Sequence, residues 1–152
     1  MASPHKLLEK TPLVFSDQIQ QKDGFYITIT LPGTTAATAA NYNHFFIARH
    51  PCEILVVKEV HGTAGTDAGA VTLDIEKLTG TTAAGSGDSI LVAGFNLKGT
   101  ANTVQSKSGA DLTGQTLVEG DRLALEDTGT LTNVANLNVT LYLKHTNRGD
   151  YR

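Results

Sequence analysis

Alternation of apolar and polar residues is the dominant pattern along most of the chain. In "FYITITL" (residues 25–31) every second side chain is apolar, and the intervening ones are Tyr or Thr. The same period of two returns at residues 71–76 and, most cleanly, at residues 137–144. Because successive side chains of a strand point to opposite faces, this period predicts β-strands with one buried face.

Shorter apolar segments predict further strands. "HFFIARH" (44–50) and "CEILVVKEVHG" (52–62) are separated by Pro51, and a turn at residues 119–121 precedes a strand at 122–126. A short strand is also expected around Val104. The run "ILVAGFNL" (90–97) fits a strand or a short helix, since period alone does not distinguish them at this length. About seven or eight short strands with regular turns and no long helix predict an all-β, antiparallel β-sandwich or jelly-roll-like domain.

The pattern divides the chain into three parts. Residues 1–22 lack a single clean period, apart from a short helical turn expected at 16–21, and are interpreted as an extended N-terminal arm. Residues 23–146 form the sandwich domain, and residues 147–152 a polar tail. The arm carries large apolar side chains that are unfavourable in water, so we expect it to pack on its own domain or on a partner. These candidate anchors are Leu7, Leu8, Leu13, Val14, Phe15 and Ile19.

The stretch "EVHGTAGTDAGAVTLDIEK" (59–77) raises the question of a phosphate-binding loop. A Walker loop requires Lys followed by Ser or Thr and then a helix. This stretch has no such Lys and continues with a strand period. A dinucleotide fingerprint also requires a strand–helix junction. The sequence therefore favours the turn of a β-hairpin.

Composition narrows the function classes. Apolar residues make up 40% of the chain and charged residues 18%, with a net charge of −3 and no basic stripe. Nucleic-acid binding is therefore not expected. No run approaches the ~18 apolar residues of a membrane span, and the first residues lack the apolar core of a signal peptide. We expect a soluble product made in the cytoplasm.

Histidines are the first candidates for chemistry. His44 and His50 have the same parity on one expected strand, and His61 or Glu53 would supply a third metal ligand. Their spacing matches no known zinc or iron motif. Ordinary surface or core histidines are favoured, and we expect no metal and no cofactor.

Nucleophilic catalysis has equally little support. Cys52 follows His50 by two residues, which places both on one strand face, but no G-x-S-x-G elbow exists and sequence proximity does not define a triad. A cysteine in an apolar run is more often a small buried side chain. Asp74, Glu76, Glu126 and Asp127 are expected on solvated strand faces or in turns. The sequence predicts a protein that is not an enzyme.

One set of segments carries a family resemblance. These are "PCEILVVKEVHGTAGT", "GAVTLDIEK", "ILVAGFNLKGTANTV", "LVEGDRLAL" and "LNVTLYLK", within residues 43–145. Together they resemble small β-sandwich proteins of tailed-bacteriophage virions, namely capsid decoration (cement) proteins and related head- or tail-fibre domains.

The resemblance implies a structural role. Such proteins bind the outer surface of the capsid, often as homotrimers, and clamp neighbouring copies of the major capsid protein. The arm, with its six apolar anchors, is what such a clamp would use, because an extended segment adds to a sheet edge and docks side chains in pockets. The expected location is the exterior of the virion.

Two alternatives stay open. A head- or tail-fibre module would recognise a host glycan or protein, and Tyr42, Phe45, Phe46 and Tyr142 are its candidate aromatic platform. A cupin-like metalloenzyme would use His44, His50 and His61.

Overall fold

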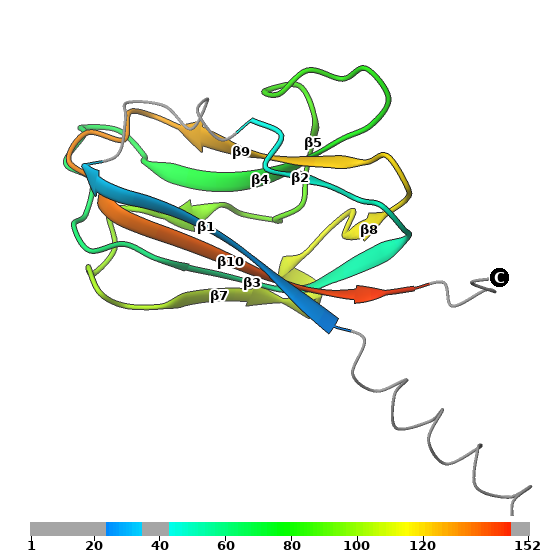
Figure 1. Cartoon of the computed structure of the whole chain (residues 1–152). Coiled ribbons are helices and arrows are strands. Elements are labelled where there is room, and N and C mark those ends of the chain that lie inside the picture. Colours follow the sequence, from blue (N-terminus) through cyan, green and yellow to red (C-terminus); the bar gives the residue numbers. More distant parts are fainter. Residues whose placement is uncertain (1–23, 35–42, 147–152) are drawn as a thin grey trace, which may run out of the picture.

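The protein is a sandwich of two antiparallel β-sheets (Figure 1). The structure, a computed structural model, describes residues 24–34 and 43–146. The elements are β1 (Gly24–Thr34), β2 (Phe46–Ile47), β3 (Cys52–Val60), β4 (Thr72–Leu78), β5 (Asp88–Ser89), β6 (Phe95–Asn96), β7 (Gln105–Ser108), the 3-10 helix η3 (Gly109–Asp111), β8 (Thr116–Leu117), β9 (Arg122–Thr128) and β10 (Ala135–His145).

The strand order is that of a jelly roll. Sheet A has the order β1-β10-β3-β7, with β8 also pairing with β3, and sheet B has the order β2-β9-β4-β5, with β6 also pairing with β4. Along the chain β1, β2, β3 and β4 alternate between the sheets, and β9 and β10 do so again. This alternation winds the chain around both sheets, as in double-sheet jelly rolls. The predicted all-β, antiparallel sandwich is confirmed.

The core lies between the sheets and follows from the alternation. On β10 the odd-numbered side chains from Leu137 to Leu143 are fully buried, and on β4 Leu73 and Ile75 meet them from sheet B. The largest side chain among them, Phe95, is also completely buried. Burying a large aliphatic or aromatic side chain contributes about 1.5–3 kcal/mol relative to leaving it in water. The inward faces therefore hold the sheets together.

The stretch at residues 59–77 is not a hairpin, and that prediction is wrong. β3 pairs with β10, β7 and β8 in sheet A, whereas β4 pairs with β9, β5 and β6 in sheet B. The segment between them crosses from one sheet to the other. Local turn signals report that the chain changes direction, but they do not report which strand it pairs with next.

Other predicted elements differ in extent. The strand expected at 44–50 shrinks to β2, because His44, with a left-handed φ of 60°, lies in a turn before it and residues 49–50 form a bend after it. The run at 90–97 contains a short strand, β6, rather than a helix. The strand expected around Val104 begins one residue later, as β7. The turn at 119–121 is confirmed, with Gly120 at a φ of 89° between β8 and β9.

Candidate functional site

The predicted partner-binding anchors lie outside the described residues. Leu7, Leu8, Leu13, Val14, Phe15 and Ile19 belong to residues 1–23, and Tyr42 belongs to residues 35–42. The boundary of the arm at residue 22 and the polar tail at residues 147–152 also lie outside the described residues. The described structure begins at Gly24, the first residue of β1.

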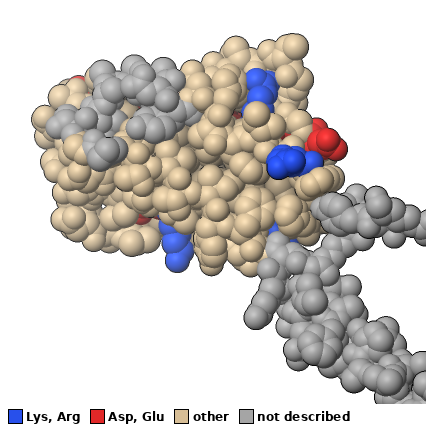
Figure 2. Space-filling view, viewed as in Figure 1, with Lys and Arg blue, Asp and Glu red and all other residues tan. Residues whose placement is uncertain are grey.

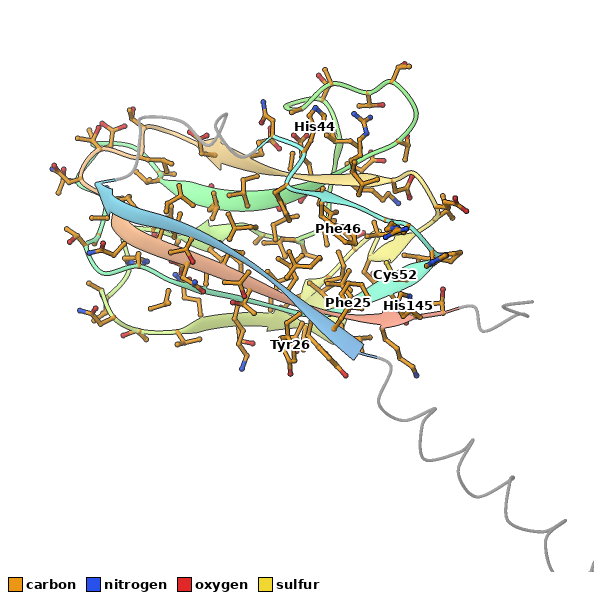
Figure 3. The ribbon with its side chains drawn as sticks, in the orientation of Figure 1. Phe25, Tyr26, His44, Phe46, Cys52 and His145 are labelled. Carbon is orange, nitrogen blue, oxygen red and sulfur yellow. The ribbon has the colours of Figure 1, made fainter. Side chains whose placement is uncertain are left out.

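A pocket opens beside that first strand, and we call it the end pocket. It has a volume of about 380 Å³. Its lining residues come from β1, β2, the turn that follows β2, and the paired ends of β3 and β10: Phe25, Phe46, Ile47, Arg49, His50, Cys52 and His145. Figure 3 shows Phe25, Phe46, Cys52 and His145 gathered at this end, with Tyr26 on the other side of β1. Register explains the convergence, because Cys52 pairs with His145 where β3 begins and β10 ends.

The end pocket has aromatic walls and a basic rim. The ring of Phe25 lies 6.2 Å from that of Phe46 and 5.0 Å from that of His145, between centroids. Ile47 is 57% exposed and adds apolar surface at the mouth of the pocket. Arg49 is exposed, and no described carboxylate lies within ion-pairing distance of it. No acidic residue lines the pocket.

His145 is an incompletely satisfied side chain in the wall of the end pocket. Its Nδ1 is buried and has no hydrogen-bond partner among the described atoms. Buried polar atoms in proteins nearly always have such a partner, so each exception asks for an explanation. The end pocket therefore combines exposed apolar surface with an unmet polar group.

Cys52 is a structural thiol rather than a nucleophile. It is buried, and burial together with the nearby negative charge of Asp121 raises its pKa. A catalytic cysteine requires the opposite shift, since the thiolate is the reactive form. His50 and Cys52 do line one pocket, as their spacing allowed, but His50 lies in the bend before β3 and not on a strand.

The outer face of sheet A carries a pair of tyrosines. Tyr26 and Tyr142 are cross-strand partners on β1 and β10, with ring centroids 4.9 Å apart. With Val56, Lys58 and Thr140 they line a shallow hollow of about 140 Å³. Tyr26 is 72% exposed. An exposed aromatic pair of this kind offers a flat apolar surface with polar hydroxyls.

Gly24 shapes that surface. The ring of Tyr142 occupies the space that the Cβ of any other residue at position 24 would need. Along β1 and β10 the face continues with neutral polar groups: the Thr28 and Thr140 hydroxyls are 3.1 Å apart, and Asn138 donates a 2.9 Å hydrogen bond to Thr30. Of this tyrosine pair, the sequence analysis selected Tyr142 and missed Tyr26. The two side chains meet because β1 and β10, which have the clearest alternation in the sequence, pair with each other.

A buried polar network closes the opposite end of β3. His61 Nδ1 lies 2.8 Å from Glu59 Oε1, and His61 Nε2 lies 3.3 Å from the carbonyl oxygen of Gly99. Gln105 donates to Glu59 Oε2 at 2.8 Å and to the carbonyl of Asn96 at 2.9 Å. Both Glu59 and His61 are essentially inaccessible to solvent.

The hydrogen-bond partners in this network determine which atoms carry its protons. Both ring nitrogens of His61 face oxygen atoms, so Nε2 donates to Gly99, and one proton is shared between Nδ1 and the Glu59 carboxyl. Burial raises the pKa of Glu59, and the bonds from His61 and Gln105 oppose that shift. Either placement of the shared proton leaves the pair neutral overall, which is what a water-free site requires. This arrangement has no access to substrate and is structural.

The acidic residues of sheet B are not all solvated, which corrects the sequence expectation. Glu76 is fully buried and accepts bonds from the backbone N–H groups of Gly85 (2.5 Å) and Gly87 (2.8 Å). Arg122, opposite Leu78 on the neighbouring β9, donates to the carbonyls of Gly80 and Thr82, both at 2.9 Å. The two side chains fasten the loop between β4 and β5 onto the sheet (Figure 1).

The neighbouring carboxyl groups repel one another. Glu126 pairs in register with Asp74, and its pKa is raised by burial and by the negative charges of Glu76, Asp74 and Asp127. Ser89 donates to Asp74 at 2.6 Å. Asp74 therefore holds the Ser89 side chain of β5 against β4.

The histidines proposed for a metal site have separate environments. His61 is held by Glu59, His44 lies 3.4 Å from Arg122 Nη1, and His50 lies against the ring of His145. Within residues 24–34 and 43–146 no group of three or more His, Cys, Asp or Glu residues is arranged to hold a metal ion. His44 and His50 do not share a strand face, because only Phe46 and Ile47 between them are in a strand.

Comparison with known proteins gives no relative: no family model, no curated protein and no solved structure matches the chain. In the described part of the chain, no helix has the length and apolarity needed to cross a membrane.

Proposed function

We propose that this chain is a structural protein of a tailed-phage virion, which binds the outer capsid surface as a homotrimer and stabilises contacts between major capsid protein subunits. The observation that carries the proposal is the position of β1. This 11-residue strand is at the edge of sheet A, where β10 is its partner among the described strands. Its other edge offers backbone donors and acceptors to a further strand.

The sequence preceding β1 supports the same role. It leads directly into this open edge and carries the six apolar anchors. A segment that is joined to the chain at an open strand edge is suited to engaging a neighbouring subunit by main-chain pairing and side-chain docking. The jelly-roll fold also occurs in viral capsid domains, but in lectins and cupins as well, so it adds only an analogy.

The surface of the domain fits a packed shell. The outer face of sheet A presents mainly Thr, Asn and Ser hydroxyls and amides. In the view of Figure 2 most of the described surface is neither acidic nor basic, and the charged side chains form small separate groups. Such a surface packs against neighbours with little charge repulsion.

The direct test is co-sedimentation with capsids of the phage that encodes the chain, after deletion of residues 1–20. We expect capsid binding to be lost while the β-sheet circular dichroism spectrum is retained. A matched pair locates the effect: Leu13, Val14 and Phe15 all changed to Ser, against Gln18, Gln20 and Gln21 all changed to Ser. Full decoration by the truncated protein would refute the role of the arm, and light scattering that gives a monomer would refute the trimer.

The tyrosine pair favours a second function, the binding of a host glycan by a fibre module. Aromatic faces stack on the apolar faces of sugar rings, and the adjacent Lys58, Thr140 and Asn138 supply polar partners. A glycan array with the wild type, Tyr26→Ala and Val92→Ala tests it, because Val92 is an exposed side chain (66%) elsewhere on the surface. A saturable hit that is lost only in Tyr26→Ala would support this function, and no hit would reject it.

A further inference from the structure

We infer that the end pocket receives a segment of this chain's own N-terminal arm, residues 14–17 (Val-Phe-Ser-Asp). In this position the arm would be held against its own domain in the free protein. The inference concerns the isolated protein and does not rest on the capsid assignment.

The size and walls of the end pocket require an apolar occupant. A volume of about 380 Å³ is within the range of pockets that bury small ligands, about 300–1,000 Å³. Phe25, Phe46 and the largely exposed Ile47 form apolar walls. Leaving this surface in water is unfavourable, and covering it with Val14 and Phe15 would remove apolar area on both sides.

Charge selects this segment among the apolar parts of the arm. The rim has Arg49, His50 and His145 and no acidic residue. In residues 14–17 an acidic side chain, Asp17, follows the apolar pair with no basic residue beside it. The other apolar pair, Leu7–Leu8, is followed by Glu9 but flanked by Lys6 and Lys10. Asp17 would therefore pair with Arg49, for which no described carboxylate serves as a partner.

The connection to β1 makes the chain's own arm the favoured occupant. β1 begins at Gly24, and the next residue, Phe25, is already in the wall of the end pocket. The six residues 18–23 span at most roughly 20 Å when extended and are enough to let the chain reverse. A short tether of this kind gives a local concentration on the order of millimolar, which a second copy reaches only at high protein concentration.

The test uses the absence of tryptophan from the chain. In the full-length variant Phe15→Trp the single indole reports on its own surroundings. Pockets bury about 70–90% of a ligand's surface, so we expect a shift of emission to shorter wavelength and acrylamide quenching about threefold weaker than in the matched variant Leu7→Trp. Water-like emission and equal quenching in the two variants would overturn the inference.

A second pair of variants locates the contact. Adding Arg49→Glu to Phe15→Trp should return the emission to that of water-exposed indole, whereas adding Lys58→Glu, an exposed cation on the outer face of sheet A, should leave it unchanged. Circular dichroism confirms that each variant is folded. If both changes act alike, or if neither acts, the end pocket is not the docking site.

A disulfide tests whether the arm in the end pocket belongs to the same chain or to a second copy. Cys52 is the single native cysteine and lines the end pocket. In Phe15→Cys, mild oxidation should give an intrachain disulfide, seen as the loss of both free thiols in an alkylation assay under denaturing conditions while the mass on a non-reducing gel stays that of one chain. An interchain product, or none, would overturn the assignment to the chain's own arm. All three experiments are done without capsids, so a failure of capsid binding leaves their results unaffected.

Discussion

The two ends of the β3–β10 ribbon hold two histidines in opposite conditions. At one end both ring nitrogens of His61 have partners, Glu59 and Gly99. At the other end His145 has a buried Nδ1 without a described partner, beside a pocket with aromatic walls. β3 has nine residues, so these ends are separated by about 27 Å. Among the described residues, the polar groups at the His61 end have partners, whereas the Nδ1 of His145 at the other end has none.

The same side-chain type therefore has two different relations to stability. His61 is part of a network in which each polar group has its partner. Removing one member leaves the others buried without a hydrogen-bond partner. His145 contributes ring packing against Phe25, and its polar atom adds little to the described fold. Four predictions test this contrast, in order of decreasing effect.

The largest effect is expected from His61→Phe. The change leaves the buried Glu59 carboxyl and the Gly99 carbonyl without the imidazole, and breaking a buried pair of this kind costs about 3–5 kcal/mol of unfolding free energy. Urea denaturation monitored by circular dichroism measures it. A loss below about 1 kcal/mol would show that the network is not what closes this end.

The pH dependence of stability gives a sharper view of the same end. Because burial raises the pKa of Glu59 above its ordinary value of 4.5, the folded protein holds the proton to a higher pH than the unfolded chain does. The contribution of Glu59 is fully present below the unfolded pKa and is lost as the pH rises through the raised folded pKa.

Glu59→Gln mimics the protonated carboxyl and lacks this titration. The unfolding free energy of the wild type minus that of Glu59→Gln should therefore fall as the pH rises above about 4.5, in urea titrations at several pH values. A difference that stays constant, or grows with pH, would contradict the raised pKa.

The matched change at the other end is His145→Phe. It keeps an aromatic ring beside Phe25 and removes the unpaired Nδ1, so the unfolding free energy should change by less than about 1 kcal/mol, with a gain as the expected sign. The same urea titration compares it directly with His61→Phe. Equal losses in the two variants would abolish the distinction between the two ends.

An effect on stability no larger than this is expected from Gly24→Ala, on the outer face of sheet A. The new Cβ would displace the ring of Tyr142, which is the movable part of the contact, so the sheet should survive with a change of about 1 kcal/mol or less. Altered tyrosine fluorescence with an unchanged far-ultraviolet spectrum would show a disturbed platform on an intact fold. Loss of the β-sheet spectrum would show that Gly24 is needed for β1 itself.

The sequence predicted the elements better than their partners. The alternation at residues 137–144 defined the buried face of β10 correctly, because period two is a local property of a strand. The crossing at residues 59–77 was missed, because pairing depends on which sheet receives β4, and small residues are equally suited to a hairpin and to a crossover. Glu76 was expected to be solvated because its burial depends on a loop that folds back over it.

The candidate site was less accessible to sequence reasoning. The end pocket draws Phe25, Phe46, Cys52 and His145 from four strands, so no local pattern brings them together. The spacing of two between Glu59 and His61 predicts that both side chains lie on one face of a strand. It does not predict that this face is buried, which only the packing of β3 in the sandwich shows. The arm anchors stay a prediction, because they lie outside the described residues.

The pairing of β1 with β10 has a consequence for how the molecule is made. Gly24 is the partner of Lys144, so the β1–β10 ribbon of sheet A joins segments on the order of a hundred residues apart. A ribosome must release nearly the whole chain before β1 finds this neighbour, and topologies rich in such distant contacts fold slowly. Until then both edges of β1 are unpaired, and nascent copies made close together on one messenger RNA are exposed to mispairing with one another.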